Sequence, residues 1–279
     1  MKLFILFSFL LMPLFPQPDA YANTQVDVKT TIQPRVDTKE SFNYDVALKT
    51  SQDAIGRVLG NYSFVDANGR SLTIEDFRGK PLILSMVYTS CYQICPMTTR
   101  HLAKVVEKAR DALGEETFAV AVVGFDTAVD TPDAMQYFAN KQGIHNKNWH
   151  LLSTSKKDAL ALSNDTGFLF YPSVSGFDHL IQASIIDAEG KVYRQVYGQV
   201  FDTPLLVEPL KELILGLPQK EQTFFSELGN KIKLFCTVYD PVRDGYYFDY
   251  SLFIGIFIGA MIIFLTAVFI VKEWRSHNP

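Results

Sequence analysis

The chain has 279 residues, a formal net charge of −4 at pH 7 and three cysteines. The small negative charge excludes a basic surface of the kind that binds nucleic acid. Three cysteines are too few for a disulfide-rich scaffold, and an odd number leaves at least one of them unpaired in a monomer.

The first 22 residues have the pattern of an export signal. Lys2 is followed by an apolar stretch over residues 3–15, and residues 20–22 (AYA) have the small side chains of a cleavage site. We predict cleavage after Ala22. The alternative is a retained N-terminal anchor, which is disfavoured because the apolar stretch is short and is interrupted by Pro13.

A second apolar segment lies near the C-terminus, at residues 251–271, and contains no charged residue. Its length matches the ~20 residues that a helix needs to cross a bilayer. Lys272 and Arg275 follow it, together with Trp274, a residue type that favours the membrane interface. With an export signal, this segment predicts a single-pass protein of the inner membrane, with a periplasmic main domain and a cytoplasmic tail at residues 272–279.

Between these two segments the chain is long enough for one domain of ordinary size with extensions. Residues 23–53 begin with a polar stretch that lacks periodicity, which predicts a linker or a loosely attached arm. We place the folded domain at residues 54–218. Residues 219–250 are predicted to be a juxtamembrane segment with a small hairpin around the turn sequence DPVRDG. Cys236 in this segment is expected to be buried. The alternatives are an intermolecular disulfide or a third thiol that contacts the Cys91–Cys95 pair or a metal held there.

The folded domain alternates between strand and helix patterns along the chain. Alternating apolar residues predict one hairpin around the sequence DANG and another around DAEG, at residues 61–77 and 180–198. Two continuous apolar runs are typical of strands buried on both faces, at residues 80–90 and 117–126. Helical spacing and capping signals predict helices at residues 96–114, 131–143, 156–167 and 203–216. Such alternation predicts an α/β sheet with helices on its faces.

Cys91 and Cys95 lie where the first buried strand runs into a helix, the sheet edge at which sites of α/β proteins gather. If the helix begins near Cys91, residues four apart lie on one face, so both thiols can converge on one soft metal ion or approach closely enough for a disulfide. A helix N-terminus also favours the thiolate. Pro96 fits a first-turn position, because it has no N–H to leave unpaired. We therefore interpret the pair as a redox or metal site rather than as packing residues.

A third ligand for such a metal would be a histidine, since imidazole suits copper and zinc. His101 comes six residues after Cys95 in the predicted helix, so it is expected to face away from the pair. His179 stands at the entry to the second hairpin, where a loop can reach another loop at the same sheet edge. An ordinary turn histidine is the alternative.

Together these features resemble the SCO (SenC) family, thioredoxin-like copper chaperones for the assembly of cytochrome c oxidase. The resemblance covers about residues 54–216. Three stretches carry it: CYQICP as the family's C-x-x-x-C-P motif, FDTAVDTP as its acidic loop, and GFDHLIQASIIDAEGKVYRQVYG as its Asp-His hairpin. It implies a thioredoxin-like fold with an N-terminal hairpin, to which this chain adds the C-terminal hairpin and the membrane helix.

Carried over residue by residue, the resemblance implies that Cys91, Cys95 and His179 bind one copper ion per chain. It also implies that Cys91 and Cys95 are redox-active and form a disulfide when oxidised. The protein would then deliver copper to the copper subunit of a cytochrome c oxidase or to a similar copper enzyme. A periplasmic thiol reductant would keep the cysteines reduced, and nucleic acid is not an expected partner.

Two other functions stay open from the residues alone. One is a thiol–disulfide oxidoreductase, in which Cys91 attacks and Cys95 resolves so that the cysteines of the client copper site stay reduced. The usual motif for that reaction has two intervening residues rather than three. His179 distinguishes this function from copper delivery, because metal binding needs the histidine and dithiol exchange does not. The other is peroxide reduction, for which Arg100 is the only local arginine that can activate a thiol.

The sequence departs from the family pattern in its acidic loop and in its membrane segment. Thr127 follows Asp126 where the family usually has proline, and we expect Asp126 and Asp130 to be solvated carboxylates of a turn and a helix cap. The membrane segment is C-terminal, whereas many relatives carry it at the N-terminus, but the domain reaches the same side of the membrane either way. Tyr92 and Met97 flank the cysteines and are expected to be packing residues, with a role in tuning or covering the site as the alternative.

Overall fold

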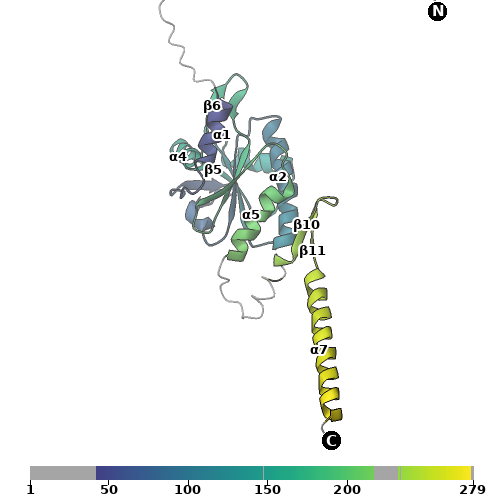
Figure 1. Cartoon of the computed structure of the whole chain (residues 1–279). Helices are drawn as coiled ribbons and strands as arrows, with labels where there is room; N and C mark the ends of the chain where they lie inside the picture. Colours follow the sequence, from purple (N-terminus) through teal and green to yellow (C-terminus); the bar gives the residue numbers. More distant parts are fainter. Residues whose placement is uncertain (1–41, 147, 217–231, 233, 278–279) are drawn as a thin grey trace, which may run out of the picture. The chain divides into compact units, whose positions relative to one another are not determined.

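The computed structural model describes residues 42–146, 148–216, 232 and 234–277 (Figure 1). The predicted export signal at residues 1–22 lies outside the described residues, as do most of the predicted arm and residues 219–231 and 233 of the predicted juxtamembrane segment. Nearly all of the predicted domain is described.

A seven-stranded mixed sheet forms the centre of the domain, in the order β2-β1-β5-β4-β3-β8-β9 (Figure 1). The central strands β3, β4 and β5 are parallel, and the pairs towards both edges are antiparallel. The predicted sequences DANG and DAEG lie in the turns that join β1 to β2 and β8 to β9. The strands are β1 (Ser63–Asp66), β2 (Ser71–Thr73), β3 (Leu82–Val87), β4 (Ala119–Gly124), β5 (Trp149–Thr154), β8 (Gln182–Ile186) and β9 (Val192–Tyr197).

Helices cover both faces of this sheet, which confirms the predicted α/β fold class. Every residue of β3 and β4 is buried, as the two apolar runs predict. Alternate side chains of β3 join different hydrophobic clusters, because successive residues of a strand point to opposite faces. Ile83 packs in the cluster with residues of α2 and α5, whereas Leu82 and Leu84 pack in the cluster with residues of α3 and α4. The helices are α2 (Ile94–Leu113), α3 (Pro132–Gln142), α4 (Lys156–Thr166) and α5 (Thr203–Gly216).

Local signals account for the ends of these helices. The side chain of Thr131 accepts a hydrogen bond from the backbone N–H of Ala134 and caps α3, with Pro132 at the first helical position. α2 ends at Gly114, whose φ of 109° lies in the region that favours glycine. Both features agree with the sequence prediction.

The prediction of an aperiodic arm over residues 23–53 is wrong for its last part. Residues Tyr44–Gln52 form a helix, α1, which Asn43 caps through its side chain. The hydroxyl of Ser51 is buried and lies 3.0 Å from that of Tyr197 in β9. α1 is short and buries few residues, so its helical periodicity in the sequence is faint.

A two-stranded sheet that the sequence analysis did not predict precedes β8. β6 (Phe170–Ser173) pairs with β7 (Gly176–His179) in antiparallel fashion, so that Phe170 lies opposite His179. This hairpin is separate from the main sheet. Its sequence contains Pro172 and lacks regular alternation, which explains why pattern analysis missed it.

A third sheet forms in the predicted juxtamembrane segment. β10 (Thr237–Asp240) pairs with β11 (Gly245–Phe248), whereas the residues just before β10 are helical rather than extended. Cys236 is buried there, as expected. The carboxylate of Asp244 in the turn accepts hydrogen bonds from Thr203 at 2.7 Å and from Tyr239 at 2.9 Å, and it is ion-paired with Lys108 of α2. The hairpin is therefore bound to the domain through α2 and α5.

The last helix, α7 (Ser251–His277), is long and apolar enough to cross a membrane. The candidate span Ser251–Arg275 has a mean hydropathy of 2.9 and is not buried by other parts of the chain. It is the one helix of this kind within the described residues. Its length and exposed apolar surface support an association with a membrane, as the sequence predicts.

Candidate functional site

The two cysteines lie on either side of the start of α2. Cys91 is in the loop after β3, and Cys95 is the second residue of the helix. The helix thus begins three residues after Cys91, and this cysteine is not in its first turn. The sulfur of Cys91 instead accepts the backbone N–H of Cys95 at 3.3 Å, so it takes the place of a capping oxygen.

The pair has the electrostatics of one thiolate beside one thiol. Both cysteines are free rather than joined in a disulfide. The pKa of Cys91 is lowered to about 4 by a hydrogen bond from the thiol of Cys95, helped by backbone N–H groups of Cys95 and Gln93 and by the hydroxyl of Tyr88. The pKa of Cys95 is raised, because its proton is bound to Cys91 and because it is buried. Cys91 is therefore the more nucleophilic sulfur of the pair at neutral pH.

His179 ends β7, on the hairpin next to the cysteine loop. Its Nδ1 lies 2.7 Å from the carbonyl oxygen of Leu180, which can only accept, so Nδ1 carries the proton and Nε2 presents a lone pair. Burial lowers the pKa of His179 and favours the neutral ring that can bind a metal. Cys95 and His179 line one small cavity of about 10 Å³, so the fold brings them to the same place.

No metal cluster is preformed at this place. Among the described residues, no three His, Cys, Asp or Glu side chains are close enough to hold a metal ion as they stand. His179 belongs to a two-stranded sheet outside the main sheet, and its ring packs against those of Tyr88, Phe125 and Phe168, at centroid distances of 6.0, 5.6 and 5.1 Å. Binding by all three residues therefore requires a local shift of the hairpin or of the side chains.

Tyr88 links the histidine hairpin to the cysteine loop, a role that the sequence analysis missed. Its hydroxyl is hydrogen-bonded to Cys91 and accepts the backbone N–H of Phe177 in β7, while burial raises its pKa to about 12. Its ring lies 6.0 Å from that of His179, centroid to centroid. A Cβ atom at Gly176 would lie 3.0 Å from the Tyr88 hydroxyl, and the φ of +120° there also requires glycine. Tyr88 lies at the end of an apolar run, so the sequence pattern indicates only that its ring packs and gives no sign of the hydrogen bonds of its hydroxyl.

The expectation that Asp130 is a solvated carboxylate is wrong. Asp130 is 2 % exposed, and burial raises its pKa. Its carboxylate accepts the backbone N–H and the hydroxyl of Thr89 at 2.8 and 2.7 Å, and the N–H of Asp126 at 2.9 Å. A Cβ atom at Gly124 would lie 2.4 Å from the Cβ of Asp130, so the close approach requires glycine. Asp130 thereby ties the acidic loop to the cysteine loop.

The side chains around the cysteines are more exposed than predicted. Tyr92 is 96 % exposed and Met97 is 43 % exposed, so they are not packing residues. His101 contacts the backbone of Phe201 and faces away from the pair, as expected. Arg100, the arginine considered for peroxide reduction, donates a hydrogen bond to Gln142 of α3 at 3.1 Å.

The part of the chain that holds this site is similar to proteins of a known family. Residues 49–214 match the family described as SCO1/SenC. The SCO1 protein homolog of Bacillus subtilis (strain 168) is 26 % identical over 161 residues, which are 55 % of this chain and 80 % of that protein. A solved structure of a candidate electron transfer protein from Aquifex aeolicus VF5 is 28 % identical with a TM-score of 0.53, and the alignment covers 60 % of this chain and 98 % of that one.

A more distant structure is that of yeast Sco1 with copper bound. It is 18 % identical with a TM-score of 0.50, and the alignment covers 60 % of this chain and 96 % of that one. At this identity the likeness concerns the fold alone.

Proposed function

Because the chain belongs to the SCO1/SenC family, we propose that it is a membrane-anchored periplasmic chaperone that delivers copper to a cytochrome c oxidase. Cys91, Cys95 and His179 hold one copper ion in this proposal. The observation that carries it is the Cys91 thiolate at the N-terminus of α2, beside a second thiol that shares a cavity with His179. Thiolate and imidazole together are a suitable donor set for copper.

The arrangement also suits release of the metal. Cys91 is only half-buried, so a thiolate of the client protein has room to attack a copper ion held there. Tyr92, Ile94 and Met97 are exposed apolar residues beside the pair and offer a contact surface to a client. A site with few ligands exchanges them readily, which a carrier needs and a permanent metal centre does not.

In this proposal the other segments of the chain keep the domain near its client. We propose an export signal at residues 1–22, a short arm before α1, a folded domain that reaches residue 218, a juxtamembrane segment at 219–250 and a membrane helix at 251–271. The helix confines the domain to the membrane plane, and this raises its effective concentration near an oxidase in the same membrane.

An anaerobic titration of the reduced full-length protein in detergent tests the proposal. Cu(I) is added in competition with a chelator of known affinity, and one tight equivalent is expected. His179→Ala should weaken binding at least about tenfold, because a ligand is lost. His145→Ala is the matched control, since that histidine is exposed and lies outside the site. Binding that ignores His179 would exclude it as a ligand.

Thiol–disulfide exchange is a second candidate, favoured by the low pKa of Cys91 and the protonated thiol next to it. The Cys91 thiolate attacks a client disulfide and forms a mixed disulfide, with one client thiolate released. The Cys95 sulfur then attacks Cys91, and its proton passes to solvent or to the second client sulfur. Two electrons thus move from the dithiol to the client disulfide. If His179→Ala leaves this reaction unchanged while no tight Cu(I) equivalent is found, the oxidoreductase function replaces the carrier function.

A further inference from the structure

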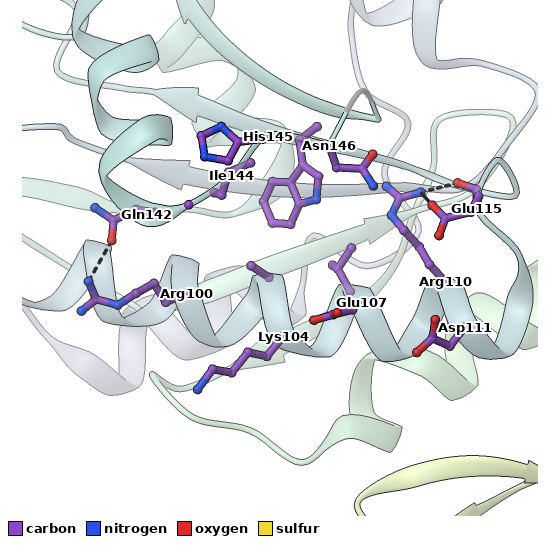
Figure 2. A pocket seen from close by; sticks show the side chains of 14 residues that line it. Arg100, Lys104, Glu107, Arg110, Asp111, Glu115, Gln142, Ile144, His145 and Asn146 are labelled. Carbon is purple, nitrogen blue, oxygen red and sulfur yellow. Dashed lines mark hydrogen bonds and ion pairs between the residues drawn. The ribbon is translucent and has the colours of Figure 1, made fainter.

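A groove of about 550 Å³ lies along the side of α2 (Figure 2), and its lining includes neither Cys91 nor Cys95. Its other wall comes from the end of α3 and the segment that leads into β5. The volume is within the range of about 300–1,000 Å³ that is typical of small-molecule sites. No part of the proposed copper function uses this groove.

Arg110 is the most unusual residue of the groove, because its cationic side chain is buried. Its residue surface is 4 % exposed, and its guanidinium lies over the ring of Phe118 at 4.8 Å from the centroid. Nη1 donates to the carbonyl oxygen of Glu115 and lies 3.9 Å from a carboxylate oxygen of the same residue. The Glu115 side chain is 65 % exposed, so this long ion pair compensates the buried charge only in part.

The other edge of the Arg110 guanidinium has no partner. Neither Nε nor Nη2 has a hydrogen-bond partner in the described part of the chain, although both atoms are buried. These two groups form the side of the guanidinium that binds a carboxylate through two parallel hydrogen bonds. In Figure 2 this edge is turned away from Glu115 and lies on the side of Asn146, which lines the groove. A buried donor pair without acceptors is costly, and an anion in the groove would satisfy both.

The rest of the groove restricts the class of anion. Trp149 and Ile144 give it an apolar wall, which fits the body of an organic ligand. The formal charges of its lining residues cancel, because Arg100, Lys104 and Arg110 are matched by Glu107, Asp111 and Glu115. The groove therefore has no net positive charge that would favour a dianion such as phosphate over a monoanion.

We propose that the groove binds a small organic carboxylate, held by Nε and Nη2 of Arg110 and packed against Trp149 and Ile144. Both N–H groups are shielded from water in this structure, so the ligand reaches them when a covering side chain turns aside. The site goes beyond copper delivery and does not depend on it.

Trp149 supplies a local probe for this site. The chain has two tryptophans, and Trp274→Phe leaves Trp149 as the single one. Full-length Trp274→Phe protein in detergent is titrated with cyclohexanecarboxylate, with the neutral cyclohexanecarboxamide, and with inorganic phosphate. A saturable change in Trp149 fluorescence is expected with the carboxylate and not with the amide, and phosphate should bind more weakly than the carboxylate.

Variants of Arg110 connect this response to the guanidinium. Arg110→Met should weaken carboxylate binding at least about tenfold, the size expected when a charge-assisted pair is lost. Arg100→Met, at the other end of the groove, is the control and should retain binding. If Arg110→Met does not fold, Arg110→Lys takes its place, because it keeps the charge and removes the fork. Equal responses to carboxylate and amide, no saturable response, or unchanged binding in the Arg110 variant would overturn the proposal.

Discussion

Both ends of α2 carry a charge that suits the helix dipole, but the two charges are met very differently. At the N-terminus the Cys91 thiolate accepts hydrogen bonds from the backbone N–H and from the thiol of Cys95. In the last turn Arg110 is paired along one edge only. A helix N-terminus has free N–H groups to offer an anion, whereas the guanidinium needs acceptors from other segments. The negative charge of Cys91 thus has its hydrogen-bond donors within the first turn of the helix, whereas the positive charge of Arg110 lacks part of its acceptors.

Loss of the charge at the N-terminal end should have the largest effect. Cys91→Ser is expected to lower the Cu(I) affinity of the reduced protein more than about 100-fold, beyond the range found when only an outer-shell partner is lost. Cys236→Ala is the matched control, since that free cysteine is buried in another part of the chain and should leave the affinity unchanged. Competition with a Cu(I) chelator measures both. Retained affinity in Cys91→Ser would show that this sulfur is not a ligand.

The pH dependence of Cys91 tests whether its charge is satisfied locally. With a pKa lowered from 9.0 to about 4, its alkylation by iodoacetamide should be nearly constant above pH 6 and fall about tenfold at pH 3. Cys95→Ala should move the midpoint upward, because the largest cause of the pKa shift is the hydrogen bond from that thiol.

The thiolate also stabilises the fold. A pKa that is depressed on folding adds stability as the pH rises from about 4 towards 9, and that stability is lost as the pH falls through about 4.

Urea unfolding at several pH values checks this second effect. The stability of the wild type should rise with pH over the window between the two pKa values, relative to Cys91→Ser. An alkylation midpoint that stays in place in Cys95→Ala would contradict the hydrogen-bonded pair.

A smaller effect is expected at Tyr88, which adds one bond to the thiolate from outside the helix. Tyr88→Phe removes the hydroxyl that joins Cys91 to the β7 backbone and keeps the ring. Copper affinity should fall about tenfold, the lower end of the range for outer-shell partners. Tyr92→Phe is the control, because that tyrosine is next to Cys91 in sequence but almost fully exposed. Equal affinities in the two variants would mean that the Tyr88 hydroxyl does not position the site.

The smallest effect is expected on stability at the Arg110 end. Replacing an incompletely paired buried charge with an apolar residue of similar size is often neutral or stabilising. Arg110→Met should change the free energy of unfolding by less than about 1 kcal/mol in urea. The carbonyl oxygen of Glu115 keeps a hydrogen bond from Asn148 at 3.0 Å, so no acceptor is left unpaired. A loss of about 3–5 kcal/mol, as found when one member of a well-paired buried couple is removed, would show that Arg110 is already satisfied.

Features with a local cause were predictable from the sequence. The apolar runs of β3 and β4, the capping signals of α3 and the turn sequences of two hairpins each depend on neighbouring residues, and all of them are present in the fold. α1 and the β6–β7 hairpin were missed. α1 buries only Ala47 and Ser51 on one short face, and the hairpin is held by contacts with distant residues such as Tyr88.

Some residues of the candidate site could likewise be predicted from the sequence, and others could not. Cys91 and Cys95 could be placed at a strand-to-helix junction, because that position follows from the order of elements along the chain. The roles of Tyr88 and Asp130 could not be predicted in this way. Tyr88 joins the end of β3 to β7, and Asp130 joins the loop after β4 to the loop after β3. Nothing in the residues next to Asp130 indicates that Thr89 covers it.

By itself, therefore, the sequence determined the two apolar terminal segments, the alternation of strands and helices and the position of the cysteine pair. These features depend on composition and periodicity over short stretches, in which the residues that interact are close together in the sequence. The tertiary structure alone decided which groups stabilise the Cys91 thiolate, that His179 shares a cavity with Cys95, and that Arg110 is buried with one edge unpaired. Burial and hydrogen bonding set these properties, and both come from segments that only folding brings together.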